Sequence, residues 1–159
     1  MRSITMNAPA EQPAALLHPT TYRFAPRATA QAASVARRRL RAGRILGALV
    51  VAFLLFDCVI KLLQLAPAVE GTVQLGYPAG VVLGIGVVEL ACLALYLLPR
   101  TSVLGAVLLT GYLGGAVATH IRVGSPLATH ALFPIYVAAL VWGSLLLRDE
   151  RLRALVRAR

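Results

Sequence analysis

Two ionisable residues lie within a stretch of chain that is otherwise almost entirely apolar. The segment FLLFDCVIKLLQL, residues 53–65, carries Asp57 and Lys61 four positions apart. Residues at i and i+4 share one face of a helix, so the carboxylate and the ammonium are predicted to pair. Two interpretations stay open. The pair only neutralises itself, or it belongs to a wider polar site.

Glu89 is a third ionisable residue in apolar surroundings, within VVELACLALYLLPRT. A carboxyl group in an apolar medium needs either a partner or a proton. The candidate partners are Lys61, His120, Arg122 and a tyrosine hydroxyl of another segment. Glu89 is therefore the strongest single candidate for a functional residue, and the alternative is a purely structural, hydrogen-bonded carboxyl group.

Four apolar segments must position these residues, and they cover residues 43–65, 77–98, 101–122 and 130–147. Each has about 18–23 residues, which as a helix span about 27–35 Å, the thickness of the hydrocarbon core of a bilayer. Backbone groups cannot stay unpaired in lipid, so each segment is predicted to be helical. The chain has 159 residues that are 58% hydrophobic and 14% charged. This composition is too apolar for a small soluble domain, and the predicted fold is all-α, an integral membrane four-helix bundle.

Arginines flank the apolar segments and indicate their orientation. The net charge is +10, and the arginines concentrate before the first segment, in the turn at Arg100 and after the fourth segment. The only charged residues at the other two loops are Glu70 and Arg122. The positive-inside rule then places both termini in the cytoplasm, in a multi-pass protein of a bacterial cytoplasmic (inner) membrane. Basic residues in this arrangement favour contact with anionic lipid over nucleic acid.

Both ends of the chain lie outside the four segments. Residues 1–36 are rich in Ala, Pro, Thr and Gln without apolar periodicity, and they are predicted to form a disordered tail. They lack the apolar region of a secretory signal, although their composition also resembles an organellar transit peptide. Met6 is a second possible translation start. Residues 149–159 are basic, with Leu152, Leu155 and Val156 at helical spacing. They form either an interfacial helix or a frayed continuation of the fourth segment.

Helical rise places several polar residues at similar depths. Asp57 lies about 20 Å from the cytoplasmic end, Glu89 about 14 Å, and Tyr112 and Tyr136 both about 17 Å. Lys61, His120, Arg122 and His130 lie nearer the external side. We therefore expect a polar interior that opens outward. The candidate pocket residues are Asp57, Lys61, Glu89, Tyr112, His120, Arg122 and Tyr136.

Small residues recur in TGYLGGAVATH, where Gly111, Gly114, Gly115 and Ala118 allow another helix to approach closely. The favoured interpretation is packing within the bundle, and the alternative is an oligomer interface.

The cysteines and histidines predict neither a disulfide bond nor a metal site. Cys58 and Cys92 differ in depth by about 12 Å, whereas a disulfide needs Cα atoms within about 7 Å. His120 and His130 lack a third anchored ligand. No redox CxxC, nucleotide motif or haem-ligand pair is present, so no intrinsic cofactor is predicted.

Three segments carry a family resemblance: GRILGALVVAFLLFDCVIKLL, the Glu89 segment with TGYLGGAVATH, and LRDERLRAL. Over residues 43–155 the chain resembles the DoxX-like family of small four-helix membrane proteins. The resemblance implies two roles. Some relatives are associated with membrane oxidoreductases that pass electrons to quinone, and others with membrane complexes that handle oxidative stress or act as assembly partners.

Three functions are therefore considered. The first is an accessory or ligand-binding subunit whose outward-opening pocket holds a quinone or lipid-like molecule. The second is a redox enzyme component that uses Glu89 and Tyr112 for proton handling, with quinone as carrier. The third is a small proton-coupled transporter. Whether the chain is an enzyme stays open, and its expected partners are the bilayer and either a membrane complex or a second copy of the chain.

Overall fold

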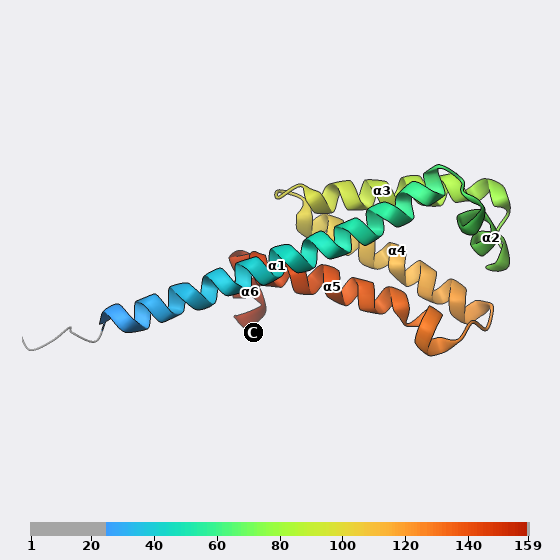
Figure 1. Cartoon of the computed structure of the whole chain (residues 1–159). Helices are drawn as coiled ribbons and strands as arrows, with labels where there is room; N and C mark the ends of the chain where they lie inside the picture. The colour runs from blue at the N-terminus through green and yellow to red at the C-terminus, as the bar shows by residue number, and fades with distance from the viewer. Residues whose placement is uncertain (1–24, 159) are drawn as a thin grey trace, which may run out of the picture.

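The computed structural model describes residues 25–158, and over this range the chain is helical without strands (Figure 1). The α-helices are α1 (Ala25–Leu62), α2 (Ala66–Gln74), α3 (Val82–Leu97), α4 (Ser102–Arg122), α5 (Phe133–Arg148) and α6 (Glu150–Arg157). A 3₁₀ turn over Ala79–Val81 precedes α3, and a π-helical turn over Leu127–Ala131 precedes α5.

Four of the helical segments are long and apolar enough to cross a membrane. They are Ala30–Leu62, Ala79–Leu97, Ser102–Arg122 and Leu127–Arg148. The prediction of an all-helical chain with four long apolar helices is thereby confirmed. Large apolar side chains cover the outer faces of these helices, such as Phe56 on α1 and Leu104 on α4. Such exposure is expected where lipid, rather than water, surrounds a helix.

The four long helices form a ring, because α1 packs against α3 and α5 while α4 packs against the same two helices from the other side. Large side chains from every helix fill the centre. The most deeply buried include Leu54 of α1, Tyr96 of α3, Leu109 of α4 and Val141 of α5. This core holds the helices at fixed rotations, and those rotations decide which polar residues face inward.

Glycine allows the helices to cross closely at positions other than the predicted ones. A Cβ added at Gly105 would lie 2.2 Å from the Tyr96 backbone nitrogen, and one added at Gly86 would lie 2.9 Å from the Lys61 Cβ. By contrast, a Cβ at Gly111, Gly114 or Gly115 would meet nothing within 4 Å.

The predicted packing of these three glycines and Ala118 within the bundle is therefore wrong. All four are exposed, and the packed face of α4 is formed instead by residues at helical spacing that include Gly105, Leu109 and Leu113. Of the four, Gly115 borders a pocket between the helices.

The N-terminal part of α1 differs from the predicted disordered tail over residues 25–36, which are helical. Their high content of alanine, with arginine and glutamine, explains the helix, since these residues have high helix propensity. The missing apolar periodicity agrees with the absence of buried side chains over residues 30–36. Figure 1 shows it projecting beyond the bundle. Residues 1–24 of the predicted tail lie outside the described residues.

Helix α2 was not predicted and closes one end of the bundle. The first span ends at Leu62 rather than at residue 65, and Pro67 lies in the first turn of α2, where its missing N–H is tolerated. Ala68 and Thr72 of α2 are buried. Beyond α2, the Tyr77 hydroxyl is 3.0 Å from the hydroxyl of Thr119 on α4. The α2 segment therefore covers the ends of the neighbouring helices.

Helix α6 is separate from α5, which excludes a simple continuation of the fourth span. Asp149 is extended, with φ −105° and ψ 110°, and its side chain accepts hydrogen bonds from the backbone N–H groups of Arg151 and Leu152. Leu152 packs against the core, whereas Leu155 and Val156 are exposed. This apolar pair among arginines is typical of a helix that lies along a membrane surface.

Replacing Asp149 by alanine should loosen α6. The change removes the N-cap, which is worth about 1 kcal/mol. Amide hydrogen exchange should become about fivefold faster across Glu150–Arg157, whereas exchange in α4 should not change. Unchanged protection of α6 would show that packing, rather than the cap, holds this helix.

Candidate functional site

Lys61 lies at the centre of a group of polar side chains from three helices. Its Nζ donates to Asp57 Oδ2 at 2.5 Å, to Glu89 Oε2 at 2.8 Å and to the Tyr112 hydroxyl oxygen at 2.9 Å. The Tyr112 hydroxyl in turn donates to Glu89 Oε2 at 2.8 Å. We call Asp57, Lys61, Glu89 and Tyr112 the Lys61 cluster. The prediction that Asp57 and Lys61 pair is confirmed, and the pair is part of a wider site.

Close helix packing produces this cluster. Asp57 and Lys61 share one face of α1 because they are four residues apart. On α3, Gly86 lets the backbone of α1 approach at Lys61, where a larger residue would collide with the Lys61 Cβ. Glu89 follows Gly86 by three residues and so lies on the same face of α3. Gly86 therefore permits the contact between Lys61 and Glu89.

The cluster contains more acid than base. Two carboxyl groups share one ammonium group, and the Glu89 side chain has no exposed surface. Glu89 Oε1 is buried without a hydrogen-bond partner among the described residues. The Asp57 side chain, by contrast, is 31% exposed. Because an unpaired buried charge is costly, the cluster is suited to hold an additional proton or to accept a hydrogen bond from a ligand at Asp57.

A pocket of about 410 Å³ lies beside the cluster, between α1, α2, α4 and α5, with Ile85 of α3 also in its wall. Asp57, Lys61 and Tyr112 form part of its wall, whereas Glu89 lies behind them. The opposite surfaces are mostly apolar. They include Phe53 of α1 and Phe133 of α5, whose rings meet edge to face with centroids 5.5 Å apart. The pocket therefore combines one polar wall with an aromatic and aliphatic surface.

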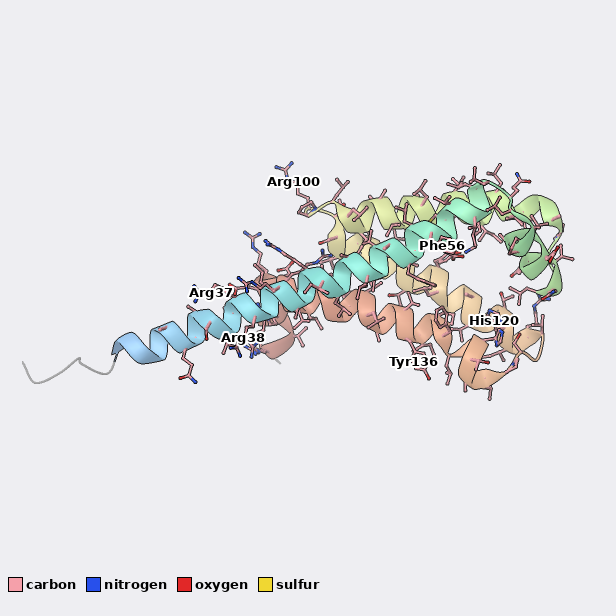
Figure 2. The ribbon with its side chains drawn as sticks, in the orientation of Figure 1. Arg37, Arg38, Phe56, Arg100, His120 and Tyr136 are labelled. Atoms are coloured by element: carbon pink, nitrogen blue, oxygen red, sulfur yellow. The ribbon has the colours of Figure 1, made fainter. Side chains whose placement is uncertain are left out.

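His120 lines the same pocket toward the α2 end of the bundle (Figure 2). Its Nδ1 lies 3.1 Å from the Ser125 hydroxyl, and its ring centroid lies 5.9 Å from that of His130. A histidine nitrogen can donate or accept a hydrogen bond, depending on its tautomer. His120 thus adds a second polar position to the pocket, apart from the Lys61 cluster.

Arg122 does not line this pocket. Its Nη2 donates to the Leu75 carbonyl oxygen at 2.7 Å, and its guanidinium group lies over the Tyr77 ring at 5.6 Å. Arg122 therefore joins the end of α4 to the segment that follows α2. In this position it stabilises the closed end of the bundle, and the expectation that it faces the interior is wrong.

Tyr136 is also outside the pocket. Its side chain is 54% exposed. Figure 2 shows it on the outer side of α5, pointing away from the bundle. The inner face of α5 is formed by Pro134, Val137 and Val141, which repeat at helical spacing. The depth estimate contained no information on the rotation of α5. The prediction of Tyr136 as a pocket residue is therefore wrong.

Sequence reasoning missed the pocket residues that come from α2 and from the aromatic surfaces, including Thr72, Tyr77, Phe53 and Phe133. Pro67 could have indicated a helix start after the first span, and thus α2. Nothing in the sequence distinguishes pocket phenylalanines from phenylalanines that face lipid.

Both cysteines are free thiols inside the helix core, in agreement with the prediction that they form no disulfide bond. Across residues 25–158, no three His, Cys, Asp or Glu side chains gather in a group that could hold a metal ion. The side chains of the Lys61 cluster and His120 can transfer protons and form hydrogen bonds.

The comparison with known families agrees with the helical architecture. The model of the DoxX-like family matches residues 45–144, a segment that contains the whole Lys61 cluster and parts or all of the four spans. No curated protein and no solved structure matches the chain. The matched segment is more than half of the chain, and together with the four apolar helices it identifies a membrane protein that belongs to the DoxX-like family.

Proposed function

We propose that this protein is an accessory or ligand-binding subunit whose pocket holds the headgroup of a quinone or a lipid-like molecule. The observation that carries the proposal is the mixed character of the pocket beside the Lys61 cluster. Its volume of about 410 Å³ falls within the range of small-molecule sites. An amphipathic molecule would place its polar atoms near Asp57 and His120 and its apolar body against Phe53 and Phe133.

The hydrogen bonds of the cluster indicate which atoms can bind a ligand. An ammonium group has three donors, and those of Lys61 already reach Asp57, Glu89 and Tyr112. Lys61 therefore holds the cluster together. The partly exposed Asp57 carboxylate is an acceptor, and His120 is a donor or an acceptor. This pair suits a ring that carries oxygen on opposite sides, such as a quinol, or a lipid headgroup with a hydroxyl group.

The proposed orientation places the pocket mouth outside the cytoplasm, in a bacterial cytoplasmic membrane. Support comes from the arginines, because Figure 2 shows Arg37, Arg38 and Arg100 toward the end of the bundle opposite to His120. The positive-inside rule assigns that arginine-rich end, and with it both termini, to the cytoplasm. A ligand would then enter from the outer leaflet, beside α2.

A redox role is the second candidate, and one observation favours it. Hydrogen bonds run without a break from Asp57 at the pocket wall, through Lys61, to the fully buried Glu89. Oxidation of a quinol releases protons, and a cluster with more acid than base can accept one. In this version the protein would position the quinol and handle its proton, while an electron acceptor would come from a partner complex.

Filling the pocket without touching the cluster tests ligand binding. Gly115 lines the pocket, and an added side chain there meets open space, so Gly115→Leu should occupy the volume that the ligand needs. Gly114→Leu is the matched control, since Gly114 is exposed, equally free of neighbours and outside the pocket. Quinone and lipid bound after mild detergent extraction should fall roughly tenfold for Gly115→Leu and remain unchanged for Gly114→Leu.

Mass spectrometry of the extracted ligands makes this measurement. Equal retention by both variants would contradict the proposed pocket. Two assays of the purified protein distinguish the alternative functions. Quinone reduction by this chain alone would favour the enzyme. Proton-dependent uptake in proteoliposomes would favour the transporter.

A further inference from the structure

A second cavity, of about 540 Å³, lies at the arginine-rich end of the bundle, where α3 and α5 end and α4 begins. It shares no lining residue with the first pocket. Its wall includes Arg44 of α1, Tyr96 of α3, Ser102 of α4, Arg148 of α5 and Arg151 of α6. We infer that this cavity binds the phosphate group of an anionic membrane lipid. The inference does not depend on the function proposed for the first pocket.

The charges in the cavity favour an anion. Arg44, Arg148 and Arg151 form no ion pair with the carboxyl groups of the described residues. Two acidic residues also line the cavity, but each has another partner. Asp149 Oδ1 accepts the backbone N–H groups at the start of α6, and Glu150 pairs with Arg153 at 3.5 Å. The cavity thus carries three guanidinium groups and two carboxylates, none of them paired with each other, which leaves an excess of positive charge.

Arg148 is held in place for such a ligand. Its guanidinium group lies over the Tyr96 ring at 5.0 Å from the centroid. The Tyr96 hydroxyl is fixed in turn by the Ser144 hydroxyl at 2.5 Å. The attraction between the guanidinium group and the ring face restricts the positions of the Arg148 side chain, and its N–H donors can bind two phosphate oxygens. Arg148 therefore pays little ordering entropy when it binds a phosphate.

Helix α4 contributes a further positive potential. It begins at Ser102, which is buried at the cavity wall, and Thr101 provides no side-chain cap for its first N–H groups. The N-terminal end of a helix of this length carries partial positive charge and attracts phosphate. Three arginines from three helices and the start of a fourth helix thus converge on one cavity.

The position in the bundle favours a lipid over a free phosphate ion. Three of the spans begin or end at the cavity, at Leu97, Ser102 and Arg148, so its depth corresponds to the headgroup region of a bilayer. Leu97 lines the cavity and is more than half exposed, and Ile45 is exposed next to Arg44 on α1. An acyl chain can follow these apolar faces while its phosphate stays with the arginines. Basic pockets between membrane helices bind anionic headgroups in this way.

Native mass spectrometry of the full-length protein in detergent tests the inference, with phosphatidylglycerol, phosphatidylcholine and inorganic phosphate as probes. The wild type should bind phosphatidylglycerol at least roughly tenfold more tightly than phosphatidylcholine. Arg148→Gln should weaken phosphatidylglycerol binding roughly tenfold. Arg100→Gln is the matched control, because Arg100 is exposed at the same end of the bundle but does not line the cavity (Figure 2). Its affinity should stay within about twofold of the wild type.

Two results would overturn the inference. Equal losses in Arg148→Gln and Arg100→Gln would mean that surface charge alone attracts the lipid. Displacement of phosphatidylglycerol by an equimolar amount of inorganic phosphate would assign the cavity to a free anion instead. If Arg148→Gln does not fold, Arg44→Gln carries the same test, since the Arg44 side chain is exposed and is not part of the stacked pair. Arg44→Gln should then also weaken phosphatidylglycerol binding.

Discussion

Replacing Lys61 by methionine is expected to destabilise the protein by about 3–5 kcal/mol, the cost of removing one partner from a buried ion pair. The change leaves Asp57 and Glu89 without their shared ammonium group, and it also removes the donor to Tyr112. Thermal unfolding in detergent, followed by the loss of monodisperse protein, should occur at a clearly lower temperature than for the wild type.

Two double variants identify which carboxylate charge the Lys61 ammonium group compensates. Glu89→Gln should restore much of the stability lost in Lys61→Met, because Glu89 has no exposed surface and its charge depends on Lys61. Asp57→Asn should restore less, because the Asp57 side chain is 31% exposed at the pocket. If adding Asp57→Asn to Lys61→Met restored the full stability, Asp57 and Lys61 would be a self-neutralising pair. The charge of Glu89 would then not depend on Lys61.

Gly105→Ala is expected to cost about 3 kcal/mol, at the upper end of the range for overpacked cores. The new Cβ would lie 2.2 Å from the Tyr96 backbone nitrogen and 2.5 Å from its Cα, so α3 and α4 must move apart. A backbone neighbour cannot rotate away as a side chain can. The measurement is again the unfolding temperature in detergent.

Gly111→Ala is the control on the same helix. A Cβ at Gly111 meets nothing within 4 Å, so the substitution should be neutral or should stabilise α4 by about 0.5–1 kcal/mol through helix propensity. Similar losses at both positions would contradict the close crossing of α3 and α4. A loss at Gly111 alone would show that its exposed face is packed against another chain in the membrane.

The sequence predicts the four spans and most of the Lys61 cluster for clear physical reasons. Long apolar segments have few alternatives to helices in lipid, and Asp57 and Lys61 must share a face at their spacing. Glu89 needs a partner from another helix because its own helix offers none. The structure brings it to Lys61 and Tyr112, both of which were among its candidate partners.

Helix rotation is the information that the sequence lacks. In a soluble protein, polar residues mark the outer face of a helix, but in a membrane the outer and inner faces are both apolar. Tyr136 and Arg122 could therefore be placed at a depth but not on a face. For the same reason the glycines of TGYLGGAVATH could not be assigned to the interior, and Gly86 and Gly105 gave no signal as crossing points.

Short helices outside the spans escaped prediction for a different reason. Helix α2 has only nine residues, and its apolar and small residues are indistinguishable from those of a loop between spans. The start of α1 is helical through propensity rather than through a buried face. Helix α2 supplies one wall of the pocket. Without α2, the sequence could predict a layer of polar residues but not the shape of the pocket.

Photocrosslinking of a ligand to its binding residues tests the central claim most directly. A photoreactive benzoquinone with a short alkyl tail would be bound to the full-length protein in detergent, and the labelled peptides would be identified by mass spectrometry. We predict labelling within residues 53–61, 112–120 and 133–137, with a loss of labelling in Gly115→Leu but not in Gly114→Leu. Labelling confined to outward-facing positions such as Val87 and Val88, and unchanged in Gly115→Leu, would contradict a ligand pocket beside the Lys61 cluster.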